Sequence, residues 1–432
     1  LLWRKALAEF LVEQGWQESH FDRCMFYMRE GKKATGRLTG ELTLHIDDEG
    51  AAGEEPVLAE LVRSMTERFG ELKLQEVSWR HIGHEYNQSW HDDGSTTITD
   101  GQEFYSKTIQ PVAIPSGPRT RLLVEEERSG LRHINGEMSY AKETRPDAMG
   151  RIAYSQQNVD KDACVQHLIE ANKALEVLHD PEVTKVLTYA PLDERYLKLV
   201  GIADGALRKK SEKYSQGCFY VLIQEVLEGD IGGRCWVVEF RTKRATRVSN
   251  SSMSAEVLIL VRCSEAMQRI SAWLHEIFYG SERARDLLDV ANPFPTQLVS
   301  DAYDVFQTLQ CSPPYQGADE SLSTYLECLR EDLLQGRLEE FCRVPTIDML
   351  ADGGSKVKDD ILAAKLLKDG AWYPSEYRIL YRANMDGADS VDRRRRSEDQ
   401  DQEEDPWFSW FFGCTEVAHV ASGCEGTCPW CT

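Results

Sequence analysis

The spacing of apolar positions over residues 1–70 predicts a helix, a hairpin and a second helix. From Trp3 to Leu11 apolar residues recur at intervals of three and four, which is typical of one face of a helix, and Gly15 predicts its end. The remaining predicted elements are strands at 24–28 and 38–46 with a turn at 31–32, and a helix from Pro56 to Gly70.

The next part of the chain changes from strand-like to helical spacing. Short strands are expected around an Asp93-Gly94 turn, followed by a short helix at 102–108. A connector rich in proline and glycine at 111–118 indicates a domain boundary. Residues 131–179 are expected to be mainly helical, with an interruption at 145–147.

From Leu197 the pattern becomes α/β. Three strand-like runs precede a long helical run, a buried strand and further helices, and this order resembles that of ribonuclease H. The predicted elements are strands at 197–203, 218–223 and 235–240, a helix at 254–277, a strand at 297–300, a helix after it, a helix at 322–334 and a strand at 339–344.

Size and charge limit the function classes. With 432 residues and 41% hydrophobic content, the chain is expected to form two or three domains. No apolar run approaches the roughly 18 residues of a spanning helix, and the start lacks a signal-peptide pattern. We therefore expect an intracellular protein, cytoplasmic or nuclear and not secreted, with no membrane partner. The net charge of −22 opposes binding to phosphate backbones, so local basic surface would have to provide it.

The chain opens on an amphipathic helix without an initiator methionine, which suggests a fragment of a longer product. The 12 cysteines are mostly scattered singly, and buried reduced thiols are the expected state. Beyond Met385 the sequence is rich in charged residues, including Arg393 to Arg396, and is expected to be disordered. Its last part could hold Zn2+, although an unstructured extension is favoured. The residues concerned are Cys414, His419, Cys424, Cys428 and Cys431.

Four acidic residues lie where an α/β sheet gathers functional groups, at strand ends or helix starts. They are Asp204, Glu256, Asp301 and Asp352. Taken singly, each has an ordinary reading as a helix cap, a turn residue or a surface charge. Carboxylates crowded together repel each other and need divalent cations, and phosphodiester hydrolysis uses two such ions about 3.5 to 4 Å apart.

Several short phrases, in order, resemble copia-type retrotransposon Pol polyproteins. His45-Ile46-Asp47-Asp48 resembles the His-Val-Asp-Asp signature, and Thr144-Arg145-Pro146-Asp147 matches Thr-Arg-Pro-Asp. Residues 251–256 resemble Ser-Ser-Thr-Glu-Ala-Glu, and 351–356 resemble Ala-Asp-x-x-Thr-Lys. Weaker matches lie at 15–19, 22–26 and 82–85, and the resemblance covers about 1–368.

The resemblance implies a reverse transcriptase and ribonuclease H remnant that hydrolyses the RNA strand of RNA-DNA hybrids. Asp204, Glu256, Asp301 and Asp352 would be the ribonuclease H metal ligands for two Mg2+ ions, with Mn2+ as a substitute. Asp47 and Asp48 would be the second carboxylate pair of the polymerase palm and also metal ligands. The palm's first aspartate belongs to a strand upstream of Trp3, so the polymerase half is expected to be incomplete. The implied partners are nucleic acid and other parts of the Pol polyprotein.

The expected fold class is α/β and α+β: an incomplete palm and thumb, a ribonuclease H-like domain with a mixed sheet, and a disordered tail. The expected divisions are 1–115 for the partial palm, 116–190 for a thumb-like or connection-like helical region, 191–370 for the ribonuclease H-like domain and 371–432 for linker and tail. The alternative is a decayed or domesticated copy that binds nucleic acid or partners without catalysis. His81, His84 and Glu85 lack the spacing of a metalloprotease motif and are expected on a solvated strand face.

Overall fold

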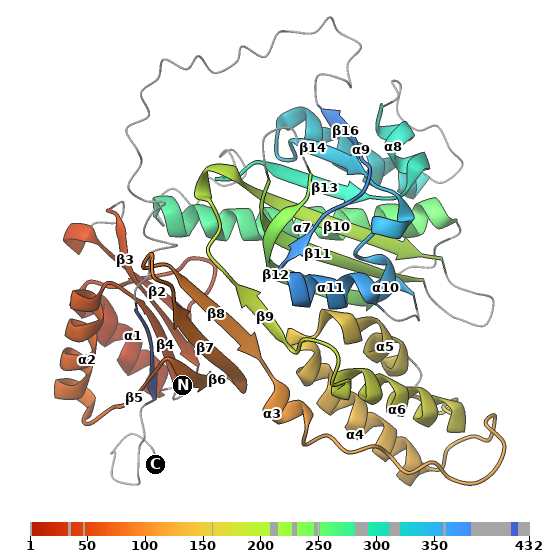
Figure 1. Ribbon diagram of the computed structural model, residues 1–432, viewed down its shortest axis with the longest axis horizontal. Coiled ribbons are helices and arrows are strands. Elements are labelled where there is room, and N and C mark those ends of the chain that lie inside the picture. Colours follow the sequence, from red (N-terminus) through yellow and green to blue (C-terminus); the bar gives the residue numbers. More distant parts are fainter. Residues whose placement is uncertain are drawn as a thin grey trace, which may run out of the picture.

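The computed structural model describes residues 2–32, 36–45, 48–157, 159–207, 215–226, 231–245, 249, 251–280, 293–310, 320–356, 360–381 and 416–421. Figure 1 shows an N-terminal sheet with two helices, a helical region, and a larger sheet crossed by one long helix. Within the described residues, no helix is both long and apolar enough to cross a membrane.

The N-terminal sheet is antiparallel throughout and packs against helices α1 and α2. Leu7 and Leu11 of α1, Phe26 and Leu42 of the sheet, and Met65 of α2 form its core. The strand order is β1 (Gln17–Glu18), β2 (Met25–Arg29), β3 (Leu38–His45), β4 (Asp48–Gly53), β17 (Glu416–Ala421) and β5 (Lys73–Glu76); the helices are α1 (Leu2–Gln14) and α2 (Glu55–Phe69). The predicted helix, hairpin and helix are confirmed.

A second, four-stranded antiparallel sheet links this unit to the helical region. Its strands are β6 (Ser78–His81), β7 (His84–Trp90), β8 (Thr96–Gly101) and β9 (Val186–Tyr189). The helices are α3 (Glu103–Ser106), α4 (Glu125–Ala141), α5 (Pro146–Gln156) and α6 (Val165–His179). Because β9 returns after the helices to pair with β8, residues 102–185 form one long excursion from this sheet.

The predicted interruption at 145–147 is confirmed and has a structural cause. Arg145 and Asp147 form a buried ion pair, with Nη2 and Oδ2 2.7 Å apart. The Arg145 guanidinium also donates to the carbonyl oxygens of Val177 and Leu178, at 2.8 and 2.6 Å. Because the last carbonyls of a helix have no partners within it, this arginine ties the end of α6 to the start of α5.

The C-terminal sheet is mixed, as predicted. Strand β10 pairs antiparallel with β11 and parallel with β13, which in turn pairs parallel with β14. The strand order is β15 (Ala371–Trp372), β12 (Gly233–Arg244), β11 (Gln216–Glu225), β10 (Leu197–Ala206), β13 (Thr296–Ser300), β14 (Glu340–Arg343) and β16 (Arg378–Tyr381). The helices after β12 are α7 (Ser252–Tyr279), α8 (Tyr303–Gln310), α9 (Glu320–Gln335), α10 (Asp352–Ser355) and α11 (Ile361–Asp369).

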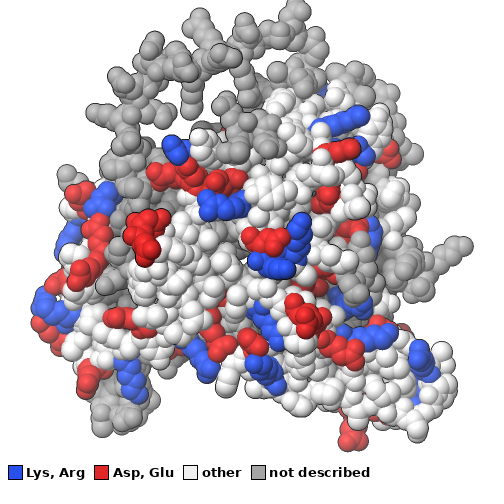
Figure 2. Space-filling model, viewed as in Figure 1, with Lys and Arg blue, Asp and Glu red and all other residues white. Residues whose placement is uncertain are grey.

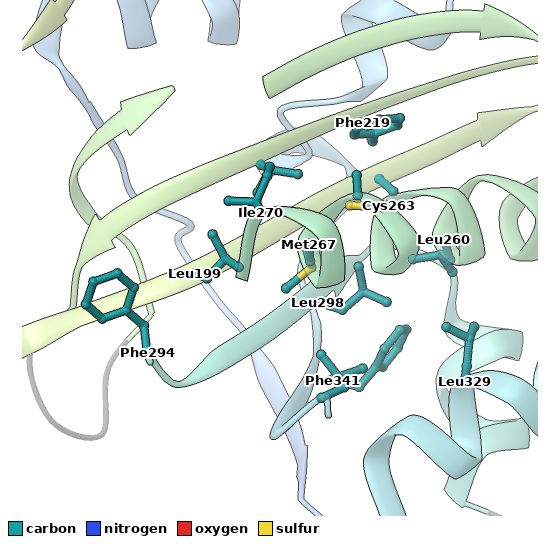
Figure 3. Close-up of a cluster of buried hydrophobic side chains, with 14 of the residues drawn as sticks. Leu199, Phe219, Leu260, Cys263, Met267, Ile270, Phe294, Leu298, Leu329 and Phe341 are labelled. Carbon is teal, nitrogen blue, oxygen red and sulfur yellow. The ribbon is translucent and has the colours of Figure 1, made fainter. Parts of the chain in front are cut away.

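Each face of this sheet is covered by a separate apolar core. On one face Leu260, Cys263 and Met267 of α7 pack against Leu199 and Leu298 of the strands (Figure 3). The opposite face packs against α5, α10 and α11, where Met149, Ala351 and Leu366 belong to one buried cluster with residues of the sheet. A sheet buried on both faces explains why its strands read as nearly continuous apolar runs.

The C-terminal end of α7 is held by the N-terminal unit. Arg29 is 1% exposed, and its guanidinium donates to the carbonyl oxygens of Glu276 and Ile277 at 2.7 and 2.9 Å. The buried carboxylate of Glu276 accepts from the Ser19 hydroxyl at 2.5 Å and from the His20 amide at 2.7 Å. Burial lowers the pKa of Arg29 to about 10. These bonds join two regions that are far apart in the sequence.

Residues 371–432, expected to be linker and tail, contribute three strands to the two large sheets. Strands β15 and β16 join the mixed sheet, and β17 pairs with β4 and β5 of the N-terminal sheet. Residues 382–415 and 422–432, with Arg393 to Arg396, lie outside the described residues. The local charge pattern could not indicate these strands, because they pair with neighbours that are distant in the sequence.

Candidate metal centre

Three of the four predicted acids converge at one place. One carboxylate oxygen from each of Asp204, Glu256 and Asp301 lies within 4.8 Å of the other two. Asp204 lies within β10, Glu256 just after the first turn of α7, and Asp301 directly after β13. Because β10 and β13 are parallel neighbours, their carboxyl ends meet at the same edge of the sheet.

Small residues allow these elements to approach closely. A Cβ atom on Gly205 would lie 2.4 Å from the carbonyl oxygen of Ala255, so only glycine permits this approach of β10 to the start of α7. On the other face, a Cβ on Gly354 would lie 2.4 Å from the Cys218 sulfur. The α7 start is fixed by Ser251, whose side chain accepts from the Ser254 amide at the N-cap.

Each acid is oriented by a neighbouring donor. The Ser355 hydroxyl donates to Oδ2 of Asp204. The Gly205 amide donates to Oε2 of Glu256 at 2.9 Å, and the Thr346 hydroxyl donates to Oδ2 of Asp301 at 2.6 Å. The carboxylates are therefore held in place by the protein itself.

The three carboxylates at this centre repel one another when they are ionised. Burial raises the pKa of Glu256 to about 9, and the nearby charges of Asp204 and Asp301 add to the effect. Burial also raises the pKa of Asp204, while the ammonium group of Lys356 lowers it. An anionic cluster that is costly to ionise in a buried position is a donor set that a divalent cation would stabilise.

Asp352 lies next to this cluster without belonging to the three. It is 3% exposed at the start of α10, and its Oδ1 forms an ion pair with the ammonium group of Lys356. Ser355, on the same short helix, contacts Asp204. The role of Asp352 as a fourth metal ligand stays a prediction. Ser355 and Lys356 appeared in the sequence only as part of the phrase at 351–356; Ser355 ends α10, and Lys356 follows it with an extended backbone.

The expected polymerase pair has a different setting. Asp47 lies outside the described residues. Asp48 begins β4, where it is half-buried and lies in register with His45 of β3 and Ala421 of β17. Within the described residues, Asp48 is not part of any group of acids with metal-ligand spacing. Its metal-binding role stays a prediction.

The expected solvated face at residues 81–85 is wrong for the two histidines. His81 is 8% exposed, and His84 Nδ1 lies 2.8 Å from Oδ1 of the buried Asp100. Glu85 pairs with Arg80 at 3.0 Å. The His84 ring also contacts that of Tyr140 in α4, with centroids 6.3 Å apart, a neighbour that the pattern of 81–85 does not indicate.

The predicted cysteine and zinc states have mixed outcomes. All cysteines of the described residues are free, and four of them are buried: Cys218, Cys235, Cys263 and Cys342. Cys328 is exposed, so the expected burial is wrong there. Of the suggested zinc residues, Cys414, Cys424, Cys428 and Cys431 lie outside the described residues, and His419 is placed only as part of β17.

Comparisons with known proteins give limited resemblance. No family model and no curated protein sequence matches the chain. One similar solved structure is the foamy viral protease-reverse transcriptase dRH in complex with double-stranded DNA, at 13% identity and a TM-score of 0.36. Another is the foamy viral protease-reverse transcriptase in complex with an RNA/DNA hybrid, at 13% identity and a TM-score of 0.34. Each covers 67% of this chain, which spans 44% and 34% of their respective lengths.

Proposed function

We propose that this chain is a ribonuclease H-type phosphodiester hydrolase that cuts the RNA strand of RNA-DNA hybrids. The observation that carries the proposal is the convergence of Asp204, Glu256 and Asp301, with oxygens within 4.8 Å of one another. The supporting frame is a mixed sheet in which three antiparallel strands are followed by a long helix and then by parallel strands.

The donor set fits magnesium. Its ligands are all carboxylate oxygens, which hard cations such as Mg2+ or Mn2+ prefer, and no sulfur or imidazole donor belongs to the described group. Asp204, Glu256 and Asp301 would hold the ions, with Asp352 beside them. Bound divalent ions would supply an activated water and stabilise the leaving oxygen.

The chain's own residues would prepare the centre for that chemistry. Ser355 and the Gly205 amide fix the orientation of Asp204 and Glu256, so the two carboxylates need not reorganise during the reaction. Lys356 places a positive charge beside both, which offsets part of their repulsion. RNA would be distinguished by hybrid shape and 2′-hydroxyl contacts rather than by base sequence.

The net charge of −22 means that basic side chains for phosphate contacts are few. Three of them line a cavity of about 600 Å³ beside β12. Lys142, Arg241 and Lys243 line it, and burial together with the other two cations lowers the pKa of Lys142. In the sheet register Lys243 pairs with Gly217, and Gly217 pairs with Gly205, next to Asp204. Two strand spacings, roughly 10 Å, separate the backbones of Lys243 and Gly205. The carboxylates of Asp100, Glu143 and Glu239 also line the cavity, so its three basic side chains offer at most one local phosphate contact.

Figure 2 shows acidic and basic side chains interspersed over the visible face, with wide uncharged areas between them. Binding through one continuous basic surface is therefore not what this face offers. We infer that affinity depends on a few local contacts and should fall with salt less steeply than for a strongly basic protein.

The test is cleavage of a hybrid whose RNA strand carries a fluorophore, with and without Mg2+. The wild-type chain should release short RNA products only with the metal, and Asp204→Asn should lose this activity. Asp92→Asn changes an exposed acid far from the cluster in sequence and should cut like the wild type. Equal cleavage by wild type and Asp204→Asn would overturn the proposal.

A second candidate is a decayed or domesticated protein that binds nucleic acid without cutting it. The observation that favours it is the ion pair of Asp352 with Lys356, which neutralises a carboxylate of this region without a metal. In this case the same hybrid would be retained in a gel-shift experiment, no products would form, and Mg2+ would not change the melting temperature. The incomplete polymerase and the association with other Pol segments stay proposals from the copia resemblance.

A further inference from the structure

The N-terminal sheet is completed by a strand from the other end of the sequence. Strand β17 lies between β4 and β5 and pairs antiparallel with both. Within the described part of the chain, β4 and β5 do not pair with each other, and β5 pairs with no strand except β17. Figure 1 shows β17 as a dark-blue strand among the red and brown strands of this sheet.

The gap that β17 fills is one strand wide. Its register covers every residue of β4, from Gly53 opposite Glu416 to Asp48 opposite Ala421, and all four residues of β5. Neighbouring strands lie about 4.8 Å apart, so β4 and β5 stand roughly 10 Å apart, too far to pair directly. Without an occupant, half of the β4 amide and carbonyl groups would face this gap unpaired, which is costly in a sheet.

The composition of the gap favours recognition through the backbone. Four of the six β4 residues are Gly50, Ala51, Ala52 and Gly53, which present little side-chain bulk. The occupant, Glu-Val-Ala-His-Val-Ala, contains two β-branched residues and neither glycine nor proline. Such a sequence suits an extended strand held mainly by main-chain hydrogen bonds.

The occupant is connected as a tethered ligand would be. The 34 residues from 382 to 415 separate β17 from the end of β16. Fully extended, that length reaches roughly 110 Å, so the tether does not force the strand into this one place. The pairing itself must select the gap.

We propose that the gap between β4 and β5 is a binding site for an extended peptide strand, and that residues 416–421 are its ligand within this chain. The ligand class is a hexapeptide in β conformation with small or β-branched residues. The site is distinct from the acid cluster, which lies in the other sheet, so the proposal does not depend on the hydrolase assignment.

The first experiment places a proline in β17 of the full chain. Because Val420 has β4 on one side and β5 on the other, its amide points to one of these strands, and Val420→Pro removes a donor and the strand conformation. Hydrogen exchange of residues 48–53 and 73–76 should become about tenfold faster or more, while 25–29 keeps its protection. Ser409→Pro, outside β17, is the matched control and should exchange like the wild type. Unchanged protection in Val420→Pro would overturn the proposal.

The second experiment adds the ligand in trans. A synthetic peptide of residues 415–423 should restore the protection of 48–53 in the Val420→Pro chain, and the same peptide carrying Val420→Pro should not. Failure of the unmodified peptide to restore protection would show that the gap does not bind a separate strand.

A third measurement does not require the proline variant to fold. A protease recognition sequence replaces 395–400 in the full chain, and the purified protein is cut. The C-terminal piece should co-elute with the body on size exclusion and leave it when excess peptide 415–423 is added. Separation immediately after cutting would contradict strand binding. Hybrid cleavage by the cut protein reports on the acid cluster independently.

Discussion

The two large sheets place their acidic residues in different ways. In the mixed sheet, β10 and β13 run parallel, so Asp204 and Asp301 reach one edge together with the start of α7. In the N-terminal sheet all neighbours are antiparallel, and the register neighbours of Asp48 are His45 and Ala421. The parallel strands bring two distant acids to one edge at their carboxyl ends, whereas neither antiparallel register neighbour of Asp48 is acidic.

The largest expected effect is a loss of cleavage activity, and it should differ between acids of the two sheets. Asp204→Asn removes a carboxylate from the cluster and should lower hybrid cleavage by about 10²- to 10³-fold, because metal-assisted stabilisation of transition-state charge is worth several kcal/mol. Asp48→Asn should change cleavage less than about twofold, since it lies in the other sheet. Initial rates at saturating Mg2+ measure both. A large loss from Asp48→Asn would mean that the two acids serve one site.

The contact between the two regions should matter next. Arg29→Met keeps an unbranched apolar stem and removes the donors to the Glu276 and Ile277 carbonyls. We expect a loss of about 2 to 4 kcal/mol in the free energy of unfolding, because buried carbonyls lose charged donors. Urea denaturation followed by tryptophan fluorescence measures it. Arg63→Met, which changes an exposed arginine paired with Glu60 and Glu67, should leave the urea midpoint nearly unchanged, because surface ion pairs contribute little.

Each region also contains a buried acid that should weaken folding as the pH rises. Burial raises the pKa of Asp360, beside the mixed sheet, to about 7, and that of Glu41, in β3, to about 7. Between pH 4 and 7 the unfolded chain releases these protons while the folded chain retains them, so stability is lost over this window and stays low above it.

The matched variants separate the two contributions. Asp360→Asn keeps an N-cap acceptor for the Ala363 amide and removes the charge. Relative to the wild type, it should gain roughly 1 to 4 kcal/mol between pH 4 and 8. Glu41→Gln should gain less, because its pKa starts from a higher ordinary value. Thermal or urea unfolding at a series of pH values measures this, and an unchanged difference across the window would contradict the assignment.

The smallest effect is expected for a substitution in α4, in the helical region. Gly136 is exposed in the helix interior, and a Cβ there would meet no atom within 4 Å. Gly136→Ala should stabilise the chain by about 0.5 to 1 kcal/mol through helix propensity. Gly354→Ala is the opposite case, because its Cβ would meet the Cys218 sulfur, and it should destabilise the chain. Similar melting temperatures for the two variants would argue against this packing.

The sequence predicted local elements well because their causes are local. The helix ends at Gly15 and Gly70 and the three strands before α7 follow from spacing and from residues that end helices. Of the three converging acids, Glu256 was found because it lies in a recognisable phrase, and Asp204 and Asp301 because each lies at the end of a predicted strand. Spacing alone could not have shown that Asp204 and Glu256 meet, since that depends on the close approach allowed by Gly205.

Features that depend on distant pairing could not be predicted. Nothing near residue 416 indicates a partner near residue 48. The sequence of a single strand does not identify the strand that it pairs with. The half-buried position of His84 beside Asp100 depends in the same way on distant pairing. The ion pair of Asp352 with Lys356 could not have been predicted from a helical spacing, because α10 ends at Ser355 and Lys356 has an extended backbone.

Helix α7 connects the acid cluster to the N-terminal unit. Glu256 lies at one end and Glu276 at the other, twenty residues away, which is about 30 Å along a helix. A tilt of about one degree about the clamped end would shift the other end by about 0.5 Å, which is the tolerance within which catalytic groups must be held. A displacement of the N-terminal unit would therefore be transmitted along α7 as a shift of Glu256 relative to Asp204 and Asp301.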